Sequence, residues 1–371
     1  MKILHLSSES TWRGGEQQII YLVEETRKLG VDAIVGCREG SVVETYCRAH
    51  DLPFVSLPFK SAYHIPTARR IIKYCKKEGI ELVQTHTSKS HTMAVIAGLL
   101  GLHIPQILTR RVDFPIKNNW FSRFKYNYSK IKRVICISET IHQMTAIDIR
   151  DKSKLITIHS GVDMDKFSPF FDSDWLRNEY DLDANTVVVG NTSAISDQKD
   201  YFTFVKVAER LIEQRKNVHF FIVGDGPTRP VIEQFVQEKG LEDHITFTGF
   251  VDNINEVLPS LDIFLFTSKT EGLGTSVLDA MAAHVPIVAT AAGGVSEMVE
   301  HEKNGLLYQV GDVEGITEGV ERFLGNKELA ITLAEEAQKT VKNFSKEKTA
   351  KRTLEVYEEI LHKKAAQSQM D

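Results

Sequence analysis

The chain has 371 residues, 42% of them hydrophobic and 26% charged, which is ordinary for a folded soluble protein of two or three domains. These values exclude disorder over most of the chain, a collagen-like repeat and a small disulfide scaffold. The net charge of −5 hides a split, because residues 1–165 carry 24 Lys and Arg against 16 Asp and Glu, whereas 166–371 carry 21 against 34. We therefore expect a basic front half and an acidic back half.

The first half alternates short strand-like runs with helix-length amphipathic runs such as 15–29 and 67–78. Short continuous apolar runs are typical of strands that are covered on both faces of a sheet. The order strand–helix–strand implies parallel strands with right-handed crossovers. We expect strands at 2–7, 32–37, 53–57, 81–87, 106–109, 133–138 and 155–159.

The alternation pauses at 160–185, a turn-rich segment that we interpret as the linker into a second domain. The second half then repeats the pattern, and its last forty or so residues are helical, with Lys and Glu at i,i+4 spacing. We expect strands at 187–191, 219–223, 245–248, 263–267, 287–290 and 306–310. The fold class is α/β, with two doubly wound Rossmann-like domains facing a cleft. Their expected bounds are 1–165 and 166–350. A C-terminal helix is expected over 351–371, and one alternative is that this helix packs back on the first domain.

The sequence has no room for a membrane span, since its longest apolar run, 93–102, has ten residues and a spanning helix needs about twenty. The N-terminus turns polar after six residues, unlike a signal peptide. The four cysteines lie far apart without a CxxC pair, which indicates buried, reduced thiols. No Cys/His spacing indicates zinc. We expect a cytoplasmic protein, with peripheral contact to the inner membrane face as an option.

The segment 268–299 carries the clearest chemical motif. A strand ending at 267 leads through Glu271 and a glycine-rich loop into a helix that is expected over 275–283. Glycine lets the backbone approach a ligand closely, and the free N–H groups at a helix start favour an anion. The residues expected to form this site are Gly272, Leu273, Gly274, Thr275 and Ser276.

Two carboxylates eight residues apart, Glu271 and Asp279, flank this loop. Each can accept hydrogen bonds from vicinal hydroxyl groups, such as those of a sugar or a ribose. The alternative is an ordinary helix N-terminus, where the helix dipole favours acidic residues. The second Gly-Gly loop, Gly293-Gly294, favours the ligand site.

This segment resembles the E-x7-E motif of retaining glycosyltransferases with the GT-B fold, in particular the large family GT4. Further segments resemble the family in the same order over about 310 residues, and the ordered set is more specific than any one of them. They are Gly14-Gly15-Glu16, 136–167, Lys199, VGDGP at 223–227, TGFVDNI at 248–254, GGVSE at 293–297 and NGLLYQVGD at 304–312.

The resemblance implies that the second domain binds a nucleoside-diphosphate sugar of the UDP or GDP type. Lys199 and the backbone of 274–276 would hold the diphosphate, Asp279 the ribose, and Glu271 the donor sugar. The first domain would bind a glycan or lipid-linked acceptor. Further substrate-binding positions implied by the family are Gly14, Gly15, Glu16, Ser193, Gly224, Phe250 and Val251.

The same resemblance implies a sugar transfer that retains the anomeric configuration and needs no metal or other cofactor, with the nucleotide sugar as co-substrate. The chemistry is consistent with this role, because breaking a sugar–phosphate bond leaves negative charge on the diphosphate. Fixed N–H dipoles and a lysine in a water-poor site stabilise that charge. Many members of this family take part in cell-envelope glycoconjugate assembly, so the resemblance suggests the same role for this chain.

Three positions depart from the family pattern. Asp279 stands where a second Glu is usual, and Ser193-Ala194-Ile195 stands where a G-R-L-like triplet supplies an arginine. Many members also carry a His where this chain has Arg110 and Arg111. We expect one of these arginines to contact the sugar phosphate or an anionic acceptor, because arginine cannot act as a base at neutral pH.

Two histidines, His86 and His91, open the expected helix after the strand at 81–87. We interpret them as contacts to the acceptor or the sugar, with helix capping and surface polarity as the alternative. His5 is expected in the core or on the floor of the cleft.

Residues 117–133 combine six basic residues with five aromatic ones. This composition is typical of a segment on an anionic membrane surface or one that grips an anionic acceptor. The alternative is an amphipathic helix packed on the sheet with a solvated basic side. Nucleic acid is not an expected partner, since no recognised binding module accompanies the charge. The DxD pattern at 163–165 lies in the linker, so we expect no metal site there.

The leading functional hypothesis is a metal-independent retaining glycosyltransferase. A nucleotide-sugar epimerase or a phosphorylase of the same fold is one alternative, and incubation with donor alone would reveal an epimer. A non-catalytic glycan- or lipid-binding protein is another, favoured by the missing His and Arg of the family pattern.

Overall fold

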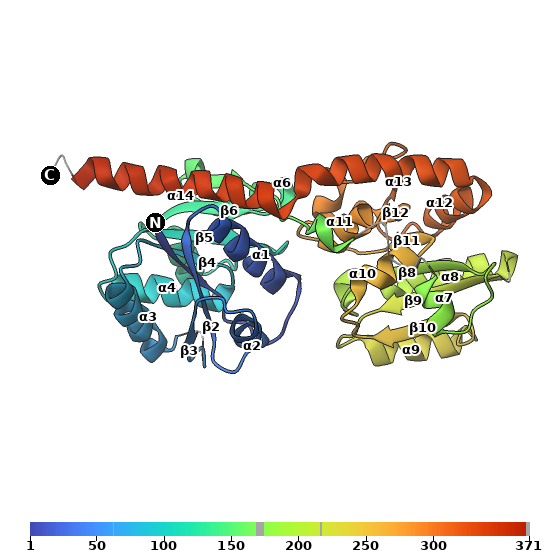
Figure 1. The fold of residues 1–371 in the computed structure, drawn as a ribbon, viewed down its shortest axis with the longest axis horizontal. Helices are drawn as coiled ribbons and strands as arrows, with labels where there is room; N and C mark the ends of the chain where they lie inside the picture. The colour runs from blue at the N-terminus through green and yellow to red at the C-terminus, as the bar shows by residue number, and fades with distance from the viewer. Residues whose placement is uncertain (62, 168–173, 216, 369–371) are drawn as a thin grey trace. The chain divides into compact units, whose positions relative to one another are not determined.

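The computed structural model describes residues 1–61, 63–167, 174–215 and 217–368, except for the side chains of 363–368. The chain forms two compact units (Figure 1). Unit 1 comprises Met1–Gly161 and Lys346–Asp371, and unit 2 comprises Val162–Ser345. The units therefore divide four or five residues before the expected bounds at 165 and 350. Residues 168–173 of the expected linker lie outside the described part of the chain.

Unit 1 contains a seven-stranded parallel sheet in the order β3-β2-β1-β4-β5-β6-β7. All seven strands expected in the first half are present. They are β1 (Lys2–Leu6), β2 (Asp32–Arg38), β3 (Phe54–Leu57), β4 (Leu82–Thr85), β5 (Gln106–Arg110), β6 (Ile131–Cys136) and β7 (Leu155–Thr157).

Helices cover both faces of this sheet, because successive strand residues point to opposite faces. Ile3 joins a core cluster with α1 and the C-terminal helix α14, whereas Leu4 joins a cluster with α3 and α4. The helices of unit 1 are α1 (Gly14–Lys28), α2 (Val42–Ala49), α3 (Ile65–Glu78), α4 (Ser88–Leu99), α5 (Trp120–Tyr126), α6 (Glu139–Ala146) and α14 (Lys346–Ser368).

Local sequence explains where these helices begin and end. The side chain of Ser41 accepts a hydrogen bond from the Glu44 N–H at the start of α2. Thr87 and Ser90 form a capping box at the start of α4. Gly79 ends α3 in the left-handed conformation, with φ of 68°, which glycine adopts without strain.

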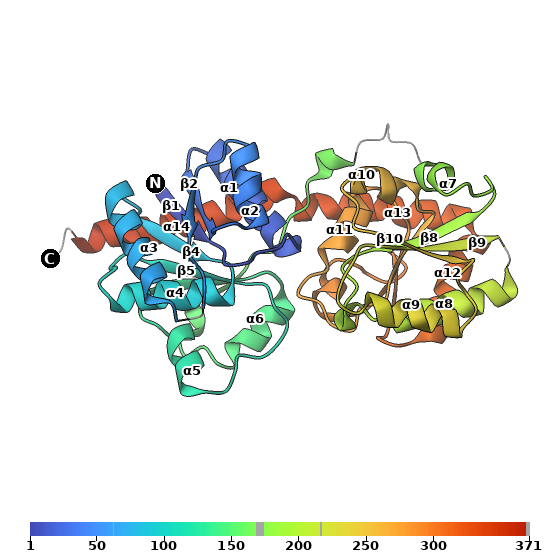
Figure 2. The same ribbon diagram turned by 90° about the horizontal axis from the view of Figure 1, so that it is seen from below.

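Helix α14 belongs to the core of unit 1, although it follows unit 2 in the sequence (Figures 1 and 2). It packs beside α1, and it places Val356, Tyr357 and Ile360 in the cluster that covers β1 and β2. The buried Tyr357 hydroxyl donates to Oε1 of Gln84 on β4. The Lys346 ammonium lies 3.6 Å from Oε1 of Glu25 on α1. These contacts tie the end of the chain to the first sheet.

Unit 2 contains a six-stranded parallel sheet in the order β10-β9-β8-β11-β12-β13. All six strands expected in the second half are present: β8 (Val187–Thr192), β9 (Val218–Val223), β10 (Ile245–Gly249), β11 (Ile263–Phe266), β12 (Ile287–Thr290) and β13 (Leu306–Tyr308). The helices are α7 (Trp175–Glu179), α8 (Tyr201–Gln214), α9 (Arg229–Glu238), α10 (Ile254–Val257), α11 (Thr275–Ala282), α12 (Val313–Gly325) and α13 (Lys327–Val341).

Short 3₁₀ turns occur between these elements. Those in unit 2 are η2 (Met164–Lys166), η3 (Asp197–Lys199), η4 (Leu258–Ser260), η5 (Gly293–Glu297) and η6 (Lys342–Phe344), and unit 1 has η1 (Lys152–Lys154). The two ends of unit 2 lie side by side, since the Val162 N–H donates to the Phe344 carbonyl at 2.8 Å.

Each sheet changes direction once in its strand order. The reversal lies between β1 and β4 in unit 1, and between β8 and β11 in unit 2. Open α/β sheets bind ligands at such a reversal, outside the carboxyl ends of the strands. His86 follows β4, Lys199 follows β8 and Glu271 follows β11. The topology alone therefore brings the main candidate residues to the two switch points.

Two further expectations are met within the described residues. All four cysteines are buried and unpaired, and burial raises the pKa values of the Cys37, Cys47 and Cys75 thiols to about 12. They are therefore unreactive at neutral pH. No described helix is both long and apolar enough to cross a membrane.

Candidate functional site

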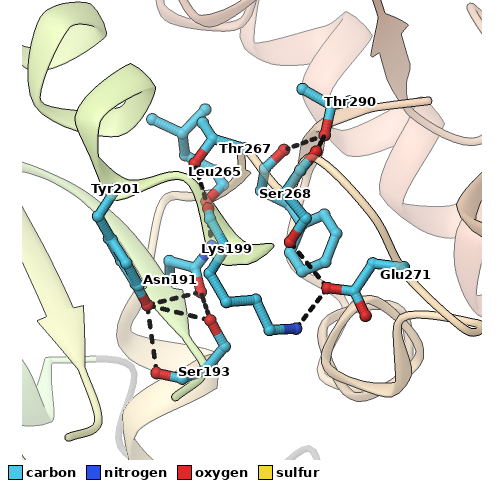
Figure 3. Close-up of polar contacts among 10 residues, drawn as sticks. Asn191, Ser193, Lys199, Tyr201, Leu265, Thr267, Ser268, Glu271 and Thr290 are labelled. Carbon is cyan, nitrogen blue, oxygen red and sulfur yellow. Dashed lines mark hydrogen bonds and ion pairs between the residues drawn. The ribbon is translucent and has the colours of Figure 1, made fainter. Parts of the chain in front are cut away.

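The switch point of unit 2 holds an ion pair between Lys199 and Glu271 (Figure 3). Lys199 ends η3, which follows β8, and Glu271 lies in the loop after β11. Both side chains are largely buried, with exposed fractions of 17% and 12%. The Lys199 ammonium also lies 5.2 Å from the centroid of the Phe266 ring, a cation–π contact. A cation and a carboxylate thus stand at the position where the fold binds ligands.

Hydrogen bonds hold the two loops of this ion pair together. The Thr267 hydroxyl donates to the carbonyl of Lys199 at 3.2 Å, and the Ser268 hydroxyl donates to Oε1 of Glu271 at 2.8 Å. Thr290 on β12 donates to the Ser268 carbonyl at 2.6 Å. Glu271 is therefore oriented by its own loop as well as by Lys199, as Figure 3 shows.

A second network fixes the turn after β8. The Ser193 hydroxyl donates to Oδ1 of Asn191 at 2.7 Å and lies 3.0 Å from the Tyr201 hydroxyl. Asn191 in turn donates to the Leu265 carbonyl on β11 at 2.8 Å. Burial raises the pKa of Tyr201 well above its usual value, so its hydroxyl remains neutral. Ser193, which was expected to bind substrate, uses its side chain to support the turn (Figure 3).

The glycine loop before α11 is shaped by close packing. Gly274 has φ of 89°, and a Cβ atom there would lie 3.0 Å from Val295. A Cβ atom on Gly293 would lie only 2.0 Å from the Glu271 carbonyl oxygen, so the second Gly-Gly loop packs on the backbone of Glu271. Leu273 is buried, so it presents only its backbone to a ligand.

The first turn of helix α11 presents free backbone N–H groups, as the sequence indicated. Its first backbone bond runs from the Val277 N–H to the Gly274 carbonyl at 2.9 Å. The N–H groups of Thr275 and Ser276 precede that bond and have no partner within the helix. The Ser276 hydroxyl is buried and has no hydrogen-bond partner. These polar groups suit an anion or a ligand hydroxyl.

Asp279 lies one turn further along α11, on the same face as Thr275 and Ser276. Burial raises the pKa of its carboxyl from 3.8 to about 6. The positive charge of Lys166 opposes this shift, and the negative charge of Asp163 adds to it. Asp279 is therefore ionised at pH 8 and mostly protonated at pH 5.

The remaining predicted residues of unit 2 lie at neighbouring strand ends. Gly224 follows β9, and a Cβ atom there would meet the Ser193 carbonyl oxygen at 2.3 Å. The N–H of Gly224 donates to the carbonyl of Gly249 at the end of β10. Phe250 comes next and is 71% exposed, and the neighbouring Val251 is half-buried. An exposed aromatic ring at this edge suits stacking on a base.

In unit 1, Gly14, Gly15 and Glu16 form the first turn of α1 after β1. A Cβ atom on Gly15 would lie 3.9 Å from the Arg111 side chain. Glu16 is buried, and burial raises the pKa of its carboxyl. The Arg111 charge partly opposes this effect. Arg111 donates to the Ser160 hydroxyl at 3.1 Å, and its pKa of about 10, lowered by burial, leaves it protonated at neutral pH.

His5, His86 and His91 are buried, which corrects the alternative that His86 and His91 provide surface polarity. Nδ1 of His5 lies 3.1 Å from Nε2 of His86, and the two rings stack with centroids 5.4 Å apart. Burial holds the pKa of His86 well below 6.5 and lowers that of His5 to about 3. His91 bonds to the Lys125 carbonyl within the fold. Of the two predicted contacts, only His86 lies at the switch point.

Arg110 contributes to the fold rather than standing ready for a ligand. It is 3% exposed, and its guanidinium donates to the Tyr126 hydroxyl at 2.9 Å and to the Phe114 carbonyl. It therefore holds the segment between β5 and α5 in place. Arg111, which lies beside Gly15 and Glu16, is the better placed of the two arginines to meet a substrate.

The segment 117–133 is not one amphipathic helix, so the alternative to a membrane or acceptor contact is wrong. Its helix, α5, covers only Trp120–Tyr126, and the segment then enters β6. Lys125 is buried and donates to hydroxyls of α4, including that of Thr92 at 3.2 Å. Its basic residues therefore do not share one solvated face. Trp120, by contrast, is 77% exposed.

Several residues of the site had no signal in the linear sequence. Tyr201, Ser268 and Thr290 act through contacts that fold distant segments together. Asn191 had a weak signal, since it is a buried polar residue in an otherwise apolar strand. Within the described ranges, no group of three or more His, Cys, Asp and Glu residues could hold a metal ion.

Comparison with known proteins identifies the family of both units. The family model described as "Glycosyltransferase Family 4" matches residues 12–166, and the one described as "Glycosyl transferases group 1" matches residues 172–340. The two matches cover strands β2 to β13 and the glycine loops and charged residues of the two switch points.

Curated relatives span most of the chain at low identity. An N-acetyl-alpha-D-glucosaminyl L-malate synthase from Bacillus anthracis is 25% identical over 312 residues, which cover 81% of this chain and 80% of the relative. A UDP-Gal:alpha-D-GlcNAc-diphosphoundecaprenol alpha-1,3-galactosyltransferase from Escherichia coli is 23% identical over 340 residues, covering 86% and 87%. Among solved structures, HepE from Anabaena in complex with UDP-glucose aligns with a TM-score of 0.86 at 22% identity, covering 97% of this chain and 100% of HepE.

Proposed function

The chain belongs to the GT4-type glycosyltransferases with the GT-B fold, and from this premise we propose that it transfers a sugar from a UDP- or GDP-sugar to a glycan or lipid-linked acceptor. We further propose that the transfer retains the anomeric configuration and requires no metal. The observation that carries the proposal is the Lys199–Glu271 pair at the switch point of unit 2. A structural neighbour that binds UDP-glucose supports a nucleotide-sugar donor.

Unit 2 is the proposed donor unit. Lys199 and the N–H groups of Thr275 and Ser276 would hold the diphosphate, whose negative charge increases as the sugar–phosphate bond breaks. Fixed donors that are already oriented stabilise such charge without reorganising. The exposed ring of Phe250 would stack on the base, and Asp279 would accept hydrogen bonds from the ribose hydroxyls.

Binding of the donor must first break the ion pair between Lys199 and Glu271. A diphosphate that enters the site offers Lys199 a new anionic partner, which offsets the loss of the carboxylate. Glu271 would then keep its bond from Ser268 and accept hydrogen bonds from the donor sugar. The pair therefore keeps both charged groups satisfied and oriented until the donor arrives.

Unit 1 is the proposed acceptor unit. Arg111 and Glu16 lie next to each other at the start of α1, and Arg111 supplies a fixed positive charge at neutral pH. The low pKa of His86 keeps its imidazole neutral, so it would act as a hydrogen-bonding contact to the acceptor or sugar. The backbone at Gly14 and Gly15 leaves room for close approach of a phosphate.

An exposed aromatic surface on unit 1 supports contact with a membrane or a lipid-linked acceptor. Trp120, Phe114 and Tyr63 are 77%, 54% and 62% exposed, and the Tyr63 ring meets that of Phe121 on α5 at 5.3 Å. Exposed Lys117 and Arg123 flank these rings. Aromatic side chains next to cations suit an interface with anionic lipid. A relative that acts on a diphosphoundecaprenol-linked sugar agrees with a role in cell-envelope glycoconjugate assembly.

A donor screen tests this proposal. The purified chain is incubated with UDP- and GDP-sugars, with and without a polyprenyl-diphosphate-linked sugar acceptor and EDTA. We expect acceptor-dependent release of one nucleotide that EDTA does not reduce, and an anomeric configuration in the product, read by NMR, that matches the donor. Product of inverted configuration would refute retention, loss of activity in EDTA would refute metal independence, and an epimer formed from donor alone would indicate an epimerase.

A further inference from the structure

A second hollow lies on unit 1, away from the switch point. Its volume is about 410 Å³, and its wall includes Lys130, Lys132 and Lys154. The lining residues precede β5, begin β6 and precede β7, which places the hollow at the amino ends of these strands. His86 and Arg111 follow the carboxyl ends of β4 and β5. The five residues of β5 span roughly 15 Å, so this hollow is distinct from the proposed acceptor site.

Positive charge dominates the wall of this hollow. In the part of the chain that the structure describes, no carboxylate lies within 4 Å of the Lys130, Lys132 or Lys154 ammonium groups. The Asp151 carboxylate accepts hydrogen bonds from the N–H and hydroxyl of Ser153 at 3.2 and 2.6 Å. It therefore holds a turn, and its charge, which also acts on Lys154 and Arg133, offsets part of the positive charge of the wall without forming an ion pair with a lysine.

The fourth cation of the wall, Arg133, is paired with Glu359 of α14. This pair joins β6 to the C-terminal helix and keeps the wall closed on that side. Besides His103, the lining residues carry four cations against two carboxylates, a net charge of +2. A hollow of this size is within the usual range for small-molecule sites.

We propose that this hollow binds a ligand that carries a diphosphate or a phosphate ester with at least two negative charges. Lysine is a compact point charge with three donors, and it suits the several oxygens of a phosphate group. Three lysines line this one hollow and supply nine N–H donors in total. The site is independent of the proposed donor site, and the inference holds whatever the transferase reaction is.

Acetylation of lysines in the intact chain tests the proposal residue by residue. A short pulse of N-hydroxysuccinimidyl acetate is given with and without pyrophosphate, and mass spectrometry reads each lysine. We expect pyrophosphate to slow modification of Lys130, Lys132 and Lys154 by about threefold or more, because a bound anion occupies their donors. Exposed Lys73 and Lys76 on α3 should not change, and Lys199 reports separately on the donor site.

Two further arms distinguish the source of the phosphate. Protection by pyrophosphate indicates a free phosphorylated ligand. Protection by vesicles that contain phosphatidic acid, whose headgroup is a phosphate monoester, but neither by pyrophosphate nor by phosphatidylcholine vesicles, indicates a lipid headgroup. Either result supports the site. Equal modification of the three lysines under all conditions would overturn the proposal, and so would equal protection by citrate, which carries no phosphate.

A set of charge-neutral variants gives a second readout. The triple variant K130Q/K132Q/K154Q should bind pyrophosphate at least about tenfold more weakly in calorimetry performed with a saturating nucleotide, since three charged contacts are lost. The matched control K73Q/K76Q/K206Q removes three exposed lysines elsewhere and should bind normally. Unchanged affinity in a folded triple variant would contradict the assignment.

Discussion

At the scale of single residues, the main feature is that Lys199 and Glu271 form an ion pair with each other. The two residues are 72 positions apart, and the family resemblance indicated each of them without indicating their mutual bond. Their pairing follows from the strand order, which places β8 beside β11. A donor can replace both contacts, because its diphosphate offers an anion to Lys199 and its sugar hydroxyls offer hydrogen bonds to Glu271.

Replacing Glu271 by Gln tests the role of its charge. We expect kcat to fall by about 100-fold or more, because an oriented charged group next to the reacting sugar is lost. Thermal unfolding should change far less, since Gln keeps the shape and one acceptor for Ser268. The control E300Q removes the exposed partner of Lys303 and should leave turnover unchanged. Full activity of E271Q would contradict the assigned site.

Asp279 predicts a specific pH dependence of nucleotide binding. Its carboxyl has a pKa of about 6, and an ionised carboxylate accepts hydrogen bonds from ribose hydroxyls more strongly than a protonated one. Nucleotide affinity should fall by about tenfold between pH 8 and pH 5. The D279N variant should not show this fall in affinity, because its side chain does not titrate. The readout is the ratio of wild-type to D279N affinity at each pH, which cancels titration of the nucleotide itself. A ratio that stays constant with pH would contradict a role for the Asp279 charge.

The same pKa shift predicts an effect on stability of the opposite sign. The folded pKa of about 6 exceeds the usual 3.8, so the folded state binds more protons between these values and stability falls as pH rises through them. D279N should therefore gain on the order of 2 kcal/mol over wild type between pH 4 and pH 8. Urea unfolding at the two pH values measures this difference. A wild type that is relatively more stable at pH 8 would refute the shift.

At the scale of secondary-structure elements, the strands were predictable and several side-chain environments were not. All thirteen expected strands are present, because a parallel sheet covered on both faces requires short apolar runs that are visible in the sequence. The burial of His91 and the capture of Arg110 by Tyr126 depend on how α4 and α5 pack. No local pattern encodes such contacts between distant segments.

The segment 117–133 illustrates the same limit. Its composition left open a single amphipathic helix packed on the sheet, but its basic residues separate into a buried lysine on α5, exposed cations, and the wall of the second hollow. The boundary between α5 and β6 decides this separation. The periodicity of a short mixed segment does not reveal such a boundary.

Helix α14 is expected to be essential for the stability of unit 1. Tyr357 is fully buried and donates to Gln84, so Y357A should lower the free energy of unfolding by about 3–5 kcal/mol. Y357F should cost about 1–2 kcal/mol, because Oε1 of Gln84 loses its donor. Urea unfolding monitored by circular dichroism measures both. The exposed K351A is the control on the same helix, and equal stability of Y357A and K351A would show that α14 is dispensable.

The exposed rings around α5 predict membrane binding. The double variant W120A/F114A should bind phosphatidylglycerol vesicles about tenfold more weakly in a sedimentation assay, since two large apolar side chains no longer enter the interface. Binding of free nucleotide to unit 2 should be unaffected. The control I147A removes a side chain that is 82% exposed on the same unit. Equal loss in the control, or no loss in the double variant, would refute a specific role for the α5 surface.

At the scale of the whole molecule, the folded units sharpen the charge asymmetry of the sequence. Helix α14 returns to unit 1, so unit 1 carries a net charge of +11 and unit 2 of −16. The bulk charge of unit 2 repels a diphosphate, and binding there must depend on local groups at short range. Lys199 and the start of α11 are those groups in the proposed site. A basic unit 1 favours an anionic acceptor.

The most direct test of the central claim is calorimetric titration of wild type and K199A with UDP and GDP. We expect one nucleotide to bind wild type, and K199A to weaken that binding by about 10- to 100-fold, as for loss of a charge-assisted hydrogen bond. The control K303A removes a lysine from an exposed ion pair and should bind like wild type. Absence of binding by both nucleotides, or equal affinity of K199A and wild type, would contradict a diphosphate site at the switch point of unit 2.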